Sequence, residues 1–376
     1  MRIAFITNVV YPFVTGGAEK RVHEIGTRLA DAGHDVTIYG RHFWDGSTEI
    51  THSGMTLRAV SPERELYAQE RRSITEAIEF AKDLVVPLYR HRHEHDIIVA
   101  SVFPYFPVLS TKLSTLFSEL PVVTTWHEVW QDYWTDYLGT LAPFGKITER
   151  FTASIPQYPL AVSGITADRL TSLSPNYDTV PVVPNGIDYD QIRSVEPADD
   201  GFDVLFAGRL IEDKRVDRLL EAFDRIAPPD STLGIIGEGP ELESLKQEAR
   251  NLETSNQISF LGFLDEYNEV LGHMRAADVF ASPSTREGFG ITYVEAMASD
   301  CTVIGADHPN SAAKEVIGDA GLVVEPTIVE LANSLDKALA DNRPTHAPRD
   351  RAQQYDWDNV AEQAASIYSR AVGGSW

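Results

Sequence analysis

Short apolar runs of four to six residues alternate with amphipathic segments along almost the whole chain, and this alternation limits the possible folds more than any other feature. At the amino terminus, an apolar run at 2–7 is followed by a segment at 18–32 whose apolar residues recur every three or four positions, and then by a second run at 35–39. Continuous apolar runs are typical of parallel strands buried on both faces, and the intervening period is helical. The pattern predicts β-α-β units and therefore parallel sheets covered by helices.

The same alternation continues through two halves of the chain, which at 376 residues is long enough for two separate cores. We expect further strands at 96–102, 122–126, 160–163, 179–183, 203–207, 233–237, 258–261, 277–281, 302–306 and 321–325, with a polar region at 41–73. The acidic, unpatterned stretch 188–201 is interpreted as a linker. The predicted architecture is α/β with two doubly wound domains, 1–190 and 191–356, and a final helix within 357–376 that could pack on either. Such domains place a cleft, the expected active site, between the carboxyl ends of their sheets.

The stretch from Ser282 to Asp300 is the strongest candidate for a ligand site. It follows an apolar run, and its two glycines, Gly288 and Gly290, let the backbone approach a ligand closely. A helix beginning near Ile291 would point its free N–H groups and positive dipole end at that spot, which suits an anion. Glu287 and Glu295 bracket the loop and could hold opposite ends of an elongated ligand such as a sugar nucleotide. The alternative is a solvated glutamate beside a surface helix.

A second candidate, Gly208-Arg209-Leu210 followed by Lys214, lies at the carboxyl end of the predicted strand 203–207. Arginine offers a bidentate fork and lysine a point charge, which together suit a diphosphate leaving group. Gly237-Glu238-Gly239 lacks the third glycine of a dinucleotide fingerprint, because Leu242 stands there, so hydride transfer is disfavoured.

In the N-terminal half, His127 follows the apolar run 122–126, the place where a doubly wound domain binds ligands. A lone histidine is more often structural, but its position on the expected cleft favours a functional role. Gly16-Gly17 at a helix start is a possible phosphate-approach loop, although such a pair is more often a plain turn. Aromatic residues cluster here at helical spacing, for which core packing or an acceptor platform are the two interpretations: Phe103, Tyr105, Phe106, Trp126, Trp130, Tyr133, Trp134 and Tyr137.

The amino-acid composition restricts the possible binding partners of this protein. Acidic residues outnumber basic ones by 56 to 32, giving a net charge of −24, which disfavours nucleic acid. We expect no N-terminal targeting sequence, and no apolar run approaches the length of about 18 residues that a membrane-spanning helix needs. Cys301 is the only cysteine, so no internal disulfide is expected. We therefore expect a cytoplasmic protein with at most peripheral membrane contact. The two Asp-x-Asp matches, at 188–190 and 356–358, are interpreted as chance, and no metal or cofactor is expected. Only 8 basic residues are lysine, and this acidic, lysine-poor composition resembles that of haloarchaeal proteins.

Together, the motifs resemble those of the retaining glycosyltransferases of family 4, which have the GT-B architecture of two Rossmann-like domains. The matching stretches are Gly16-Gly17-Ala18-Glu19, His127, Pro184-Asn185-Gly186-Ile187-Asp188, Gly208-Arg209-Leu210 with Lys214, Gly237-Glu238-Gly239-Pro240, Phe260-Leu261-Gly262-Phe263, and Glu287 with Glu295. The chain departs from the family at Asp300-Cys301, where Gly-x-Pro is common, and at the acidic loop 307–310, which leaves the donor sugar poorly constrained.

The resemblance implies a nucleotide-diphosphate sugar donor, UDP- or GDP-linked, whose diphosphate is held by Arg209 and Lys214. It assigns the phosphate or sugar to the backbone at Phe289, Gly290 and Ile291 and to Gly16 and Gly17, the ribose to Glu295, the sugar hydroxyls to Glu287, and the base to Gly237, Gly262 and Phe263. His127 would position the sugar.

The resemblance further implies sugar transfer with retention and without a protein nucleophile, to a lipid-linked or cell-surface glycan acceptor, and a final helix that returns to the N-terminal domain. The alternatives are a sugar-nucleotide isomerase or phosphorylase on the same fold, and a non-catalytic sugar-nucleotide sensor.

Overall fold

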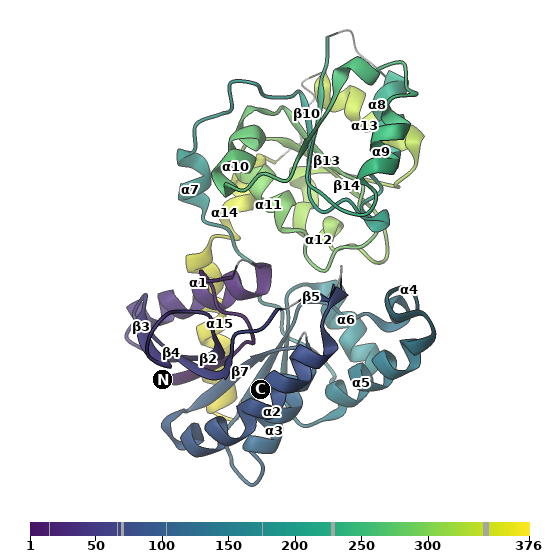
Figure 1. Cartoon of the computed structure of the whole chain (residues 1–376). Coiled ribbons are helices and arrows are strands. Elements are labelled where there is room, and N and C mark those ends of the chain that lie inside the picture. Colours follow the sequence, from purple (N-terminus) through teal and green to yellow (C-terminus); the bar gives the residue numbers. More distant parts are fainter. Residues whose placement is uncertain are drawn as a thin grey trace. The chain divides into compact units, whose positions relative to one another are not determined.

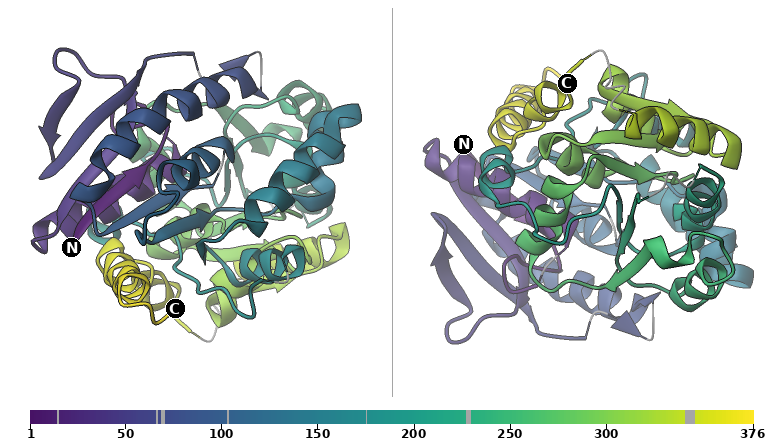
Figure 2. Two further views of the ribbon diagram at one scale, coloured as in Figure 1. Left: turned by 90° about the horizontal axis from the view of Figure 1, so that it is seen from below. Right: turned by 90° about the horizontal axis from the view of Figure 1, so that it is seen from above.

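The computed structural model describes residues 1–14, 16–65, 67–68, 71–102, 104–174, 176–226, 230–340 and 346–376. Contacts within these ranges divide the chain into two units, Met1–Pro184 with Asp358–Trp376, and Asn185–Trp357. Figures 1 and 2 show that each unit has a twisted sheet at its centre with helices on both faces. The predicted α/β fold with two doubly wound domains is confirmed. Phe103 lies outside the described residues.

The N-terminal unit contains a sheet in the order β3-β4-β2-β1-β7-β8-β9, parallel throughout except that β3 runs antiparallel to β4. Its strands are β1 (Arg2–Ile6), β2 (Asp35–His42), β3 (Glu49–His52), β4 (Met55–Pro62), β7 (Ile97–Ser101), β8 (Val122–Trp126) and β9 (Tyr158–Ala161). A short antiparallel ribbon, β5 (Tyr67–Ala68) and β6 (Arg71–Arg72), precedes α2. The helices are α1 (Gly17–Asp31), α2 (Ile74–His91), α3 (Phe106–Ser114), α4 (Trp134–Leu138), α5 (Ala142–Ser154), α6 (Gly164–Leu173) and α15 (Trp357–Val372).

The residues of β1 from Ile3 to Ile6 are all apolar, with no polar residue alternating between them, and the packing of the strand explains this. Ala4 and Ile6 pack in one core with buried side chains of α2 and α3. Phe5 points to the other face, where its ring lies 6.2 Å from that of Tyr368 in α15. Because successive residues of a strand point to opposite faces, a strand covered on both sides must be apolar at every position.

Two predictions in this unit were wrong. The polar region 41–73 contains β4 and part of β2. Strand β4 lies between β3 and β2, and buried and half-buried positions are mixed along it, so its sequence has no clear strand pattern. The expected strand 179–183 is only a single bridge between Ala161 and Val182.

The C-terminal unit has a wholly parallel sheet in the order β12-β11-β10-β13-β14-β15. Its strands are β10 (Val204–Ala207), β11 (Leu233–Ile236), β12 (Ile258–Gly262), β13 (Val279–Ser282), β14 (Thr302–Ala306) and β15 (Gly321–Val324). The helices are α7 (Tyr189–Ser194), α8 (Val216–Ile226), α9 (Leu242–Ala249), α10 (Tyr267–Ala276), α11 (Ile291–Ala298), α12 (Ala313–Ile317), α13 (Ile328–Leu339) and α14 (Pro348–Gln353). Phe206 faces the core formed with α8 and α13, whereas Phe280 faces Tyr293 of α11 on the other side.

The stretch interpreted as an unpatterned linker, 188–201, contains helix α7. The Asp188 side chain caps this helix by accepting a hydrogen bond of 2.8 Å from the Gln191 backbone N–H. Asp356 accepts a hydrogen bond of 3.2 Å from the Tyr189 N–H. Both Asp-x-Asp matches therefore contribute a structural carboxylate, and the capping residue is a start signal that the acidic composition concealed.

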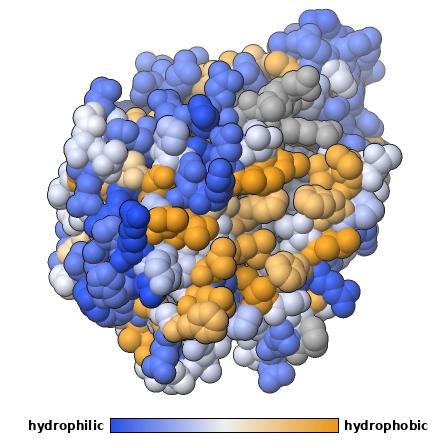
Figure 3. Space-filling model, turned by 60° about the horizontal axis from the view of Figure 1, so that its bottom comes forward, coloured by the Kyte–Doolittle hydropathy of each residue, from blue (hydrophilic) through white to orange (hydrophobic). Residues whose placement is uncertain are grey.

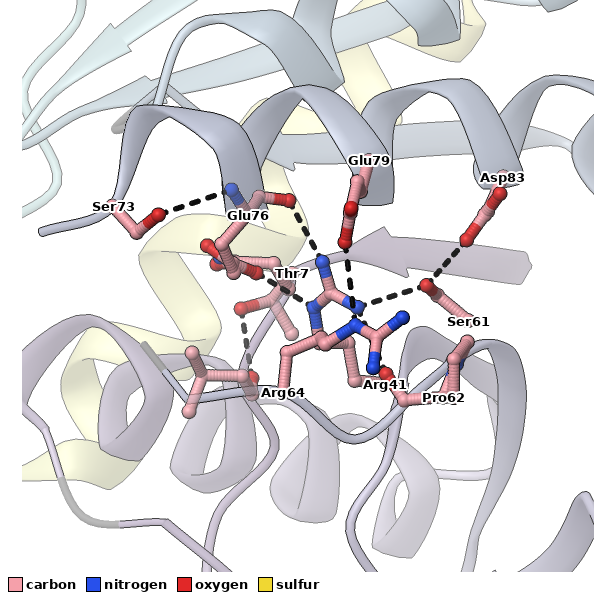
Figure 4. Close-up of polar contacts among 11 residues, drawn as sticks. Thr7, Arg41, Ser61, Pro62, Arg64, Ser73, Glu76, Glu79 and Asp83 are labelled. Atoms are coloured by element: carbon pink, nitrogen blue, oxygen red, sulfur yellow. Dashed lines mark hydrogen bonds and ion pairs between the residues drawn. The ribbon is translucent and has the colours of Figure 1, made fainter. Parts of the chain in front are cut away.

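A buried ion pair joins three strands of the N-terminal unit to α2 (Figure 4). Arg41, at the end of β2, donates from Nε to Glu76 Oε1 at 2.6 Å and from Nη1 to Ser61 Oγ at 2.9 Å. Asn8, after β1, donates to the same carboxylate at 3.1 and 3.2 Å. The side chains of Arg41 and Glu76 are 0% and 3% exposed. Because each charge is buried, removing one partner leaves the other without compensation.

We therefore expect Arg41→Ala to lower the free energy of unfolding of the N-terminal unit by about 3–5 kcal/mol. The matched control is Arg2→Ala, which removes an arginine whose ion pair with Asp96 is exposed, and it should change stability little. Differential scanning calorimetry resolves the transitions of the two units. Equal losses in the two variants would contradict this account of the ion pair.

Candidate functional site

The motifs of the C-terminal unit lie along one edge of its sheet. Arg209 follows β10, Gly237 follows β11, Gly262 ends β12 and Glu287 follows β13. All six strands are parallel, so their carboxyl ends share this edge. Strands β10 and β13 are neighbours from which the strand order proceeds in opposite directions. They form the topological switch point, where open α/β sheets bind ligands.

The loops after β10, β11 and β12 touch through glycine backbone. The Gly237 N–H donates to the Gly262 carbonyl at 2.8 Å. Gly237 has a φ of +135°, and a Cβ there would lie 1.9 Å from the Gly208 carbonyl oxygen, so a side chain is excluded. Phe263, next to Gly262, is 66% exposed. Backbone without side chains beside an exposed aromatic ring suits a planar ligand group.

Lys214 and Glu287 form an ion pair between the loops after β10 and β13. The Lys214 ammonium donates to Glu287 Oε1, and the two side chains are only 18% and 11% exposed. The Glu287 backbone is held on both sides, because its N–H donates to the Asn310 carbonyl at 3.1 Å and its carbonyl accepts from the Ala312 N–H at 2.9 Å. Two residues predicted separately from the sequence therefore meet at the switch point.

Arg209 differs from its neighbour Lys214. Arg209 is exposed to solvent. Among the described residues, no side chain or carbonyl accepts a hydrogen bond from its guanidinium. A cation without a counter-ion is available to an anionic ligand, and the guanidinium fork is shaped for two phosphate oxygens.

Asp213 ties the two loops together, and sequence analysis missed it. Its carbonyl accepts from the Thr285 N–H at 2.8 Å and from the hydroxyls of Ser284 and Thr285 at 3.3 and 3.2 Å. Its carboxylate lies 3.6 Å from the Arg286 guanidinium. Asp213 immediately precedes Lys214, and Arg286 immediately precedes Glu287. The two dipeptides therefore have charges of opposite order, and this is the sequence signal from which their pairing could have been predicted. This second ion pair positions the first.

Helix α11 begins at the carboxyl end of β13 with no side-chain cap. Gly290, its N-cap, is left-handed with φ of 82° and ψ of 63°, which favours glycine. Phe289 is buried and its ring lies 5.5 Å from that of Tyr355. The first N–H groups of the helix, from Ile291 onward, carry the positive end of its dipole at this edge. An anion site at the start of this helix stays a prediction.

Glu295 is 6% exposed, and its Oε1 accepts a hydrogen bond of 2.5 Å from the Tyr267 hydroxyl. Tyr267 begins α10 and was not among the predicted residues, because nothing in the sequence links two positions 28 residues apart. Its phenol fixes the direction of the carboxylate.

His127 follows β8 in the N-terminal unit. Its Nε2 is buried, and no described residue forms a hydrogen bond with it. Burial, with a smaller contribution from the positive charge of Arg21, lowers the pKa of His127 to about 3. Its imidazole is therefore neutral at pH 7, and the orphaned Nε2 is a buried polar atom that a ligand could satisfy.

Gly16 and Gly17 are placed as predicted, at the start of α1 after β1. Gly16 is the N-cap, has extended backbone and makes no side-chain cap bond. A Cβ at Gly17 would meet no atom within 4 Å. Strands β1 and β8 are separated by β7 in the sheet, so these glycines and His127 lie at the same carboxyl edge, two strands apart.

In the described part of the chain, no group of three or more histidine, cysteine or carboxylate side chains is placed to hold a metal ion. Over the same ranges, no helix combines the length and apolar character that a membrane crossing needs.

Comparisons with known proteins identify the family to which the chain belongs. The model of Glycosyltransferase Family 4 matches residues 15–191, and that of Glycosyl transferases group 1 matches residues 188–355. The phosphatidyl-myo-inositol mannosyltransferase of Mycobacterium tuberculosis is 31% identical over 292 residues, which cover 72% of each chain. The glycogen synthase of the same species is 26% identical, covering 100% of this chain and 96% of that protein.

Solved structures show the same fold. Sucrose-phosphate synthase from Thermosynechococcus elongatus has a TM-score of 0.78 at 21% identity and full coverage of both chains. Anabaena HepE in complex with UDP-glucose has a TM-score of 0.72 at 20% identity, covering 98% of this chain and 99% of that one.

Because the pKa of His127 is held at about 3, we expect its imidazole to stay neutral between pH 5 and pH 8. The measurement is an NMR titration of the ring Cε1 signal, assigned by its absence from His127→Asn. The signal should not move across this range. A titration with a midpoint near the ordinary value of about 6.5 would contradict the burial argument.

Proposed function

The chain belongs to the GT-B glycosyltransferases, with the domains of Glycosyltransferase Family 4 and Glycosyl transferases group 1, and on this premise we propose that its donor is a nucleotide-diphosphate sugar. The observation that carries the proposal is the unpaired guanidinium of Arg209 in the same loop as Lys214, whose ion pair with Glu287 is largely shielded from water. A diphosphate gains negative charge when its bond to the sugar breaks, and this site offers two cations and a helix dipole to stabilise it.

We assign the parts of the donor to the residues around that edge. Arg209 and Lys214 bind the diphosphate, with the N–H groups from Phe289 to Ile291 beside them. Glu287, already held by Lys214, accepts hydrogen bonds from hydroxyls of the donor sugar.

The nucleoside occupies the rest of the edge. Glu295, oriented by Tyr267, accepts from the ribose hydroxyls. The base lies against the glycine surface at Gly237 and Gly262, next to Phe263. The UDP-glucose complex of Anabaena HepE supports a donor of this class for the fold.

Transfer proceeds with retention in this proposal. The bond from the sugar C1 to the diphosphate oxygen breaks, and the acceptor oxygen forms a bond to C1 on the same face. The acceptor proton passes to an oxygen of the departing diphosphate, so no protein nucleophile and no metal ion is needed. Arg209 and Lys214 stabilise the charge on that leaving group.

From the N-terminal unit, neutral His127 contributes a hydrogen bond to the donor sugar, and the Gly16-Gly17 backbone lies against phosphate or sugar. A neutral imidazole suits this positioning role because it does not repel the cations that bind the diphosphate.

The acceptor is a hydroxyl of a lipid-linked or cell-surface glycan, reached from the cytoplasm. Support comes from relatives named as phosphatidyl-myo-inositol mannosyltransferases and glycogen synthases, which act on a lipid and on a polymer.

We expect one class of UDP-, GDP-, ADP- or dTDP-sugar to raise the melting temperature, and Arg209→Ala to weaken its binding by about 10- to 100-fold, because a charge-assisted hydrogen bond contributes about 1.5–3 kcal/mol. Titration calorimetry gives the dissociation constants. The matched control is Arg250→Ala, an exposed arginine at the end of α9 and hence at the opposite edge of the sheet.

The outcomes separate the alternatives. Equal binding by both variants would remove Arg209 from the donor site. Turnover of the donor without an acceptor, or with inorganic phosphate, would indicate an isomerase or a phosphorylase. Donor binding without nucleotide release in the presence of any acceptor would indicate a sensor.

The net charge of −24, with 8 lysines among the basic residues, supports adaptation to a high-salt cytoplasm. Screening weakens repulsion among like charges, so the melting temperature should rise steadily as KCl increases from about 0.1 M to about 2 M. Thermal denaturation followed by circular dichroism measures this. A melting temperature that is unchanged across the series would contradict the proposed adaptation.

A further inference from the structure

Glu149 is the one acidic residue of helix α5, and its side chain is fully buried in the N-terminal unit. The opposite side of the helix is apolar, since Ile147 and Phe151 are 68% and 57% exposed. Figure 3 shows apolar side chains gathered into one broad area of the molecular surface. A surface helix ordinarily exposes its charges and buries its apolar residues, and α5 reverses this pattern at Glu149. A carboxylate removed from water is costly unless hydrogen bonds compensate it.

Three donors compensate this carboxylate, and all three follow strands at the carboxyl edge of the sheet. Glu149 Oε1 accepts from the Tyr105 hydroxyl at 2.8 Å and from the Trp130 backbone N–H at 2.7 Å. Its Oε2 accepts from the Gln131 backbone N–H at 2.9 Å. Tyr105 follows β7, and the other two donors follow the neighbouring strand β8. In the described part of the chain, no arginine or lysine forms an ion pair with Glu149, which therefore serves as an acceptor for these two loops.

The loop held by Glu149 is the one that carries His127. Before His127, the backbone is fixed by the sheet, because the Trp126 carbonyl at the end of β8 accepts from the Val162 N–H at 3.2 Å. After it, the Trp130 N–H is bonded to Glu149. Only residues 127–129 lie between these two fixed points. Fixing both ends of so short a segment restricts the directions that the imidazole can take.

The loop backbone is strained where Glu149 holds it. Gln131 has a φ of 46°, in the left-handed region that residues with a side chain rarely adopt. Such a conformation persists only where surrounding contacts impose it, and it is frequent at functional sites. Here the Gln131 N–H is bonded to Glu149, and its Nε2 donates to Ser172 Oγ at 3.1 Å.

Gly145, one helical turn before Glu149 on the same side of α5, allows the helix to approach this loop closely. A Cβ at Gly145 would lie 2.3 Å from the Trp134 ring, so a side chain is excluded there. The centroid of the Trp134 ring lies 4.7 Å from that of Trp130. Close packing of α5 on Trp134 therefore brings the Glu149 carboxylate within hydrogen-bonding distance of the loop.

We propose that Glu149 is a positioning residue for sugar transfer, which fixes the loop after β8 so that His127 can hydrogen-bond the donor sugar. This role depends on the one proposed above for His127. A carboxylate offers acceptor sites on both oxygens, whereas a glutamine side chain has one acceptor oxygen and an NH₂ donor in place of the other. In Glu149→Gln, at least one of the three donors therefore faces another donor, and the loop loses its anchor.

The test compares binding of a sugar nucleotide with binding of its nucleoside diphosphate, because only the first contains the sugar assigned to His127. The probes are UDP-glucose and UDP, with GDP-mannose and GDP as the second pair. In titration calorimetry, Glu149→Gln should weaken binding of the sugar nucleotide by about 2- to 10-fold, the contribution of one hydrogen bond. Binding of the nucleoside diphosphate should not change. His127→Asn should have the same effect.

A double-mutant cycle separates positioning from a general structural effect. If Glu149 acts through His127, then Glu149→Gln combined with His127→Asn should weaken sugar-nucleotide binding no more than His127→Asn alone. Additive losses would overturn the proposal. The matched control is Thr152→Val, which removes another fully buried polar group from α5, a hydroxyl that donates to the Thr148 carbonyl of the same helix at 2.8 Å. This control should leave both affinities unchanged.

Amide hydrogen exchange tests the anchor itself, without a ligand. In the wild type, the N–H groups of Trp130 and Gln131 should exchange much more slowly than in an unfolded chain. In Glu149→Gln they should exchange faster, while the N–H groups of β8 stay protected. Rapid exchange of both groups in the wild type would overturn the proposal even if Glu149→Gln did not fold.

The outcomes distinguish this role from the proposed function. A loss of sugar-nucleotide affinity in His127→Asn without a loss in Glu149→Gln would contradict the positioning role alone. Unchanged affinity in His127→Asn would contradict the role proposed for His127. Binding of neither pair of probes would contradict a UDP- or GDP-linked donor, and the positioning role with it.

Discussion

Parallel strand pairing decides where chemistry is possible in this chain, because it brings the carboxyl ends of all paired strands to one edge. In the C-terminal unit, this constraint places Arg209, Lys214, Gly237 and Glu287 on loops that follow neighbouring strands, although they are up to 78 residues apart in sequence. Most positions within the strands of this unit are buried and apolar, and no strand that the structure describes in this unit contains a charged residue. Its charged groups lie on the loops at the ends of the strands and on the helix surfaces, where they can bind a ligand.

Charge is distributed unevenly in this acidic protein, and the pattern follows burial. The buried Arg41 and the partly buried Lys214 each have a carboxylate partner, whereas the buried Arg21 donates to the backbone carbonyls of Val183 and Pro184. Arg209 remains exposed at the switch point. An ion pair such as Lys214–Glu287 holds both groups in fixed directions before a ligand arrives, which lowers the reorganisation that transfer requires. The positive charge of Lys214 is balanced by Glu287, whereas Arg209 offers an unbalanced positive charge to the ligand. The site thus combines a preorganised ion pair with an arginine that is available for binding.

Helix α2 connects the interior of the N-terminal unit with its surface. The carboxylate of Glu76 that neutralises Arg41 lies on the buried side of the helix, whereas Ile74 and Ile78 are exposed on its other side. An apolar pocket, lined by Ile74 and Ala77 among other residues, begins at the first turn of this helix.

The sequence by itself determined the two doubly wound domains and the loops that carry the candidate site, because strand and helix periodicities and glycine-bearing turns are local signals. Only the tertiary structure decided the rest. The pairing of Lys214 with Glu287 and of Tyr267 with Glu295 joins residues distant in sequence. Strand β4 and helix α7 have weak local sequence patterns. Which apolar residues stay outside, as on α2 and α5, depends on what packs against each side of a helix, and that is a property of the fold rather than of the segment.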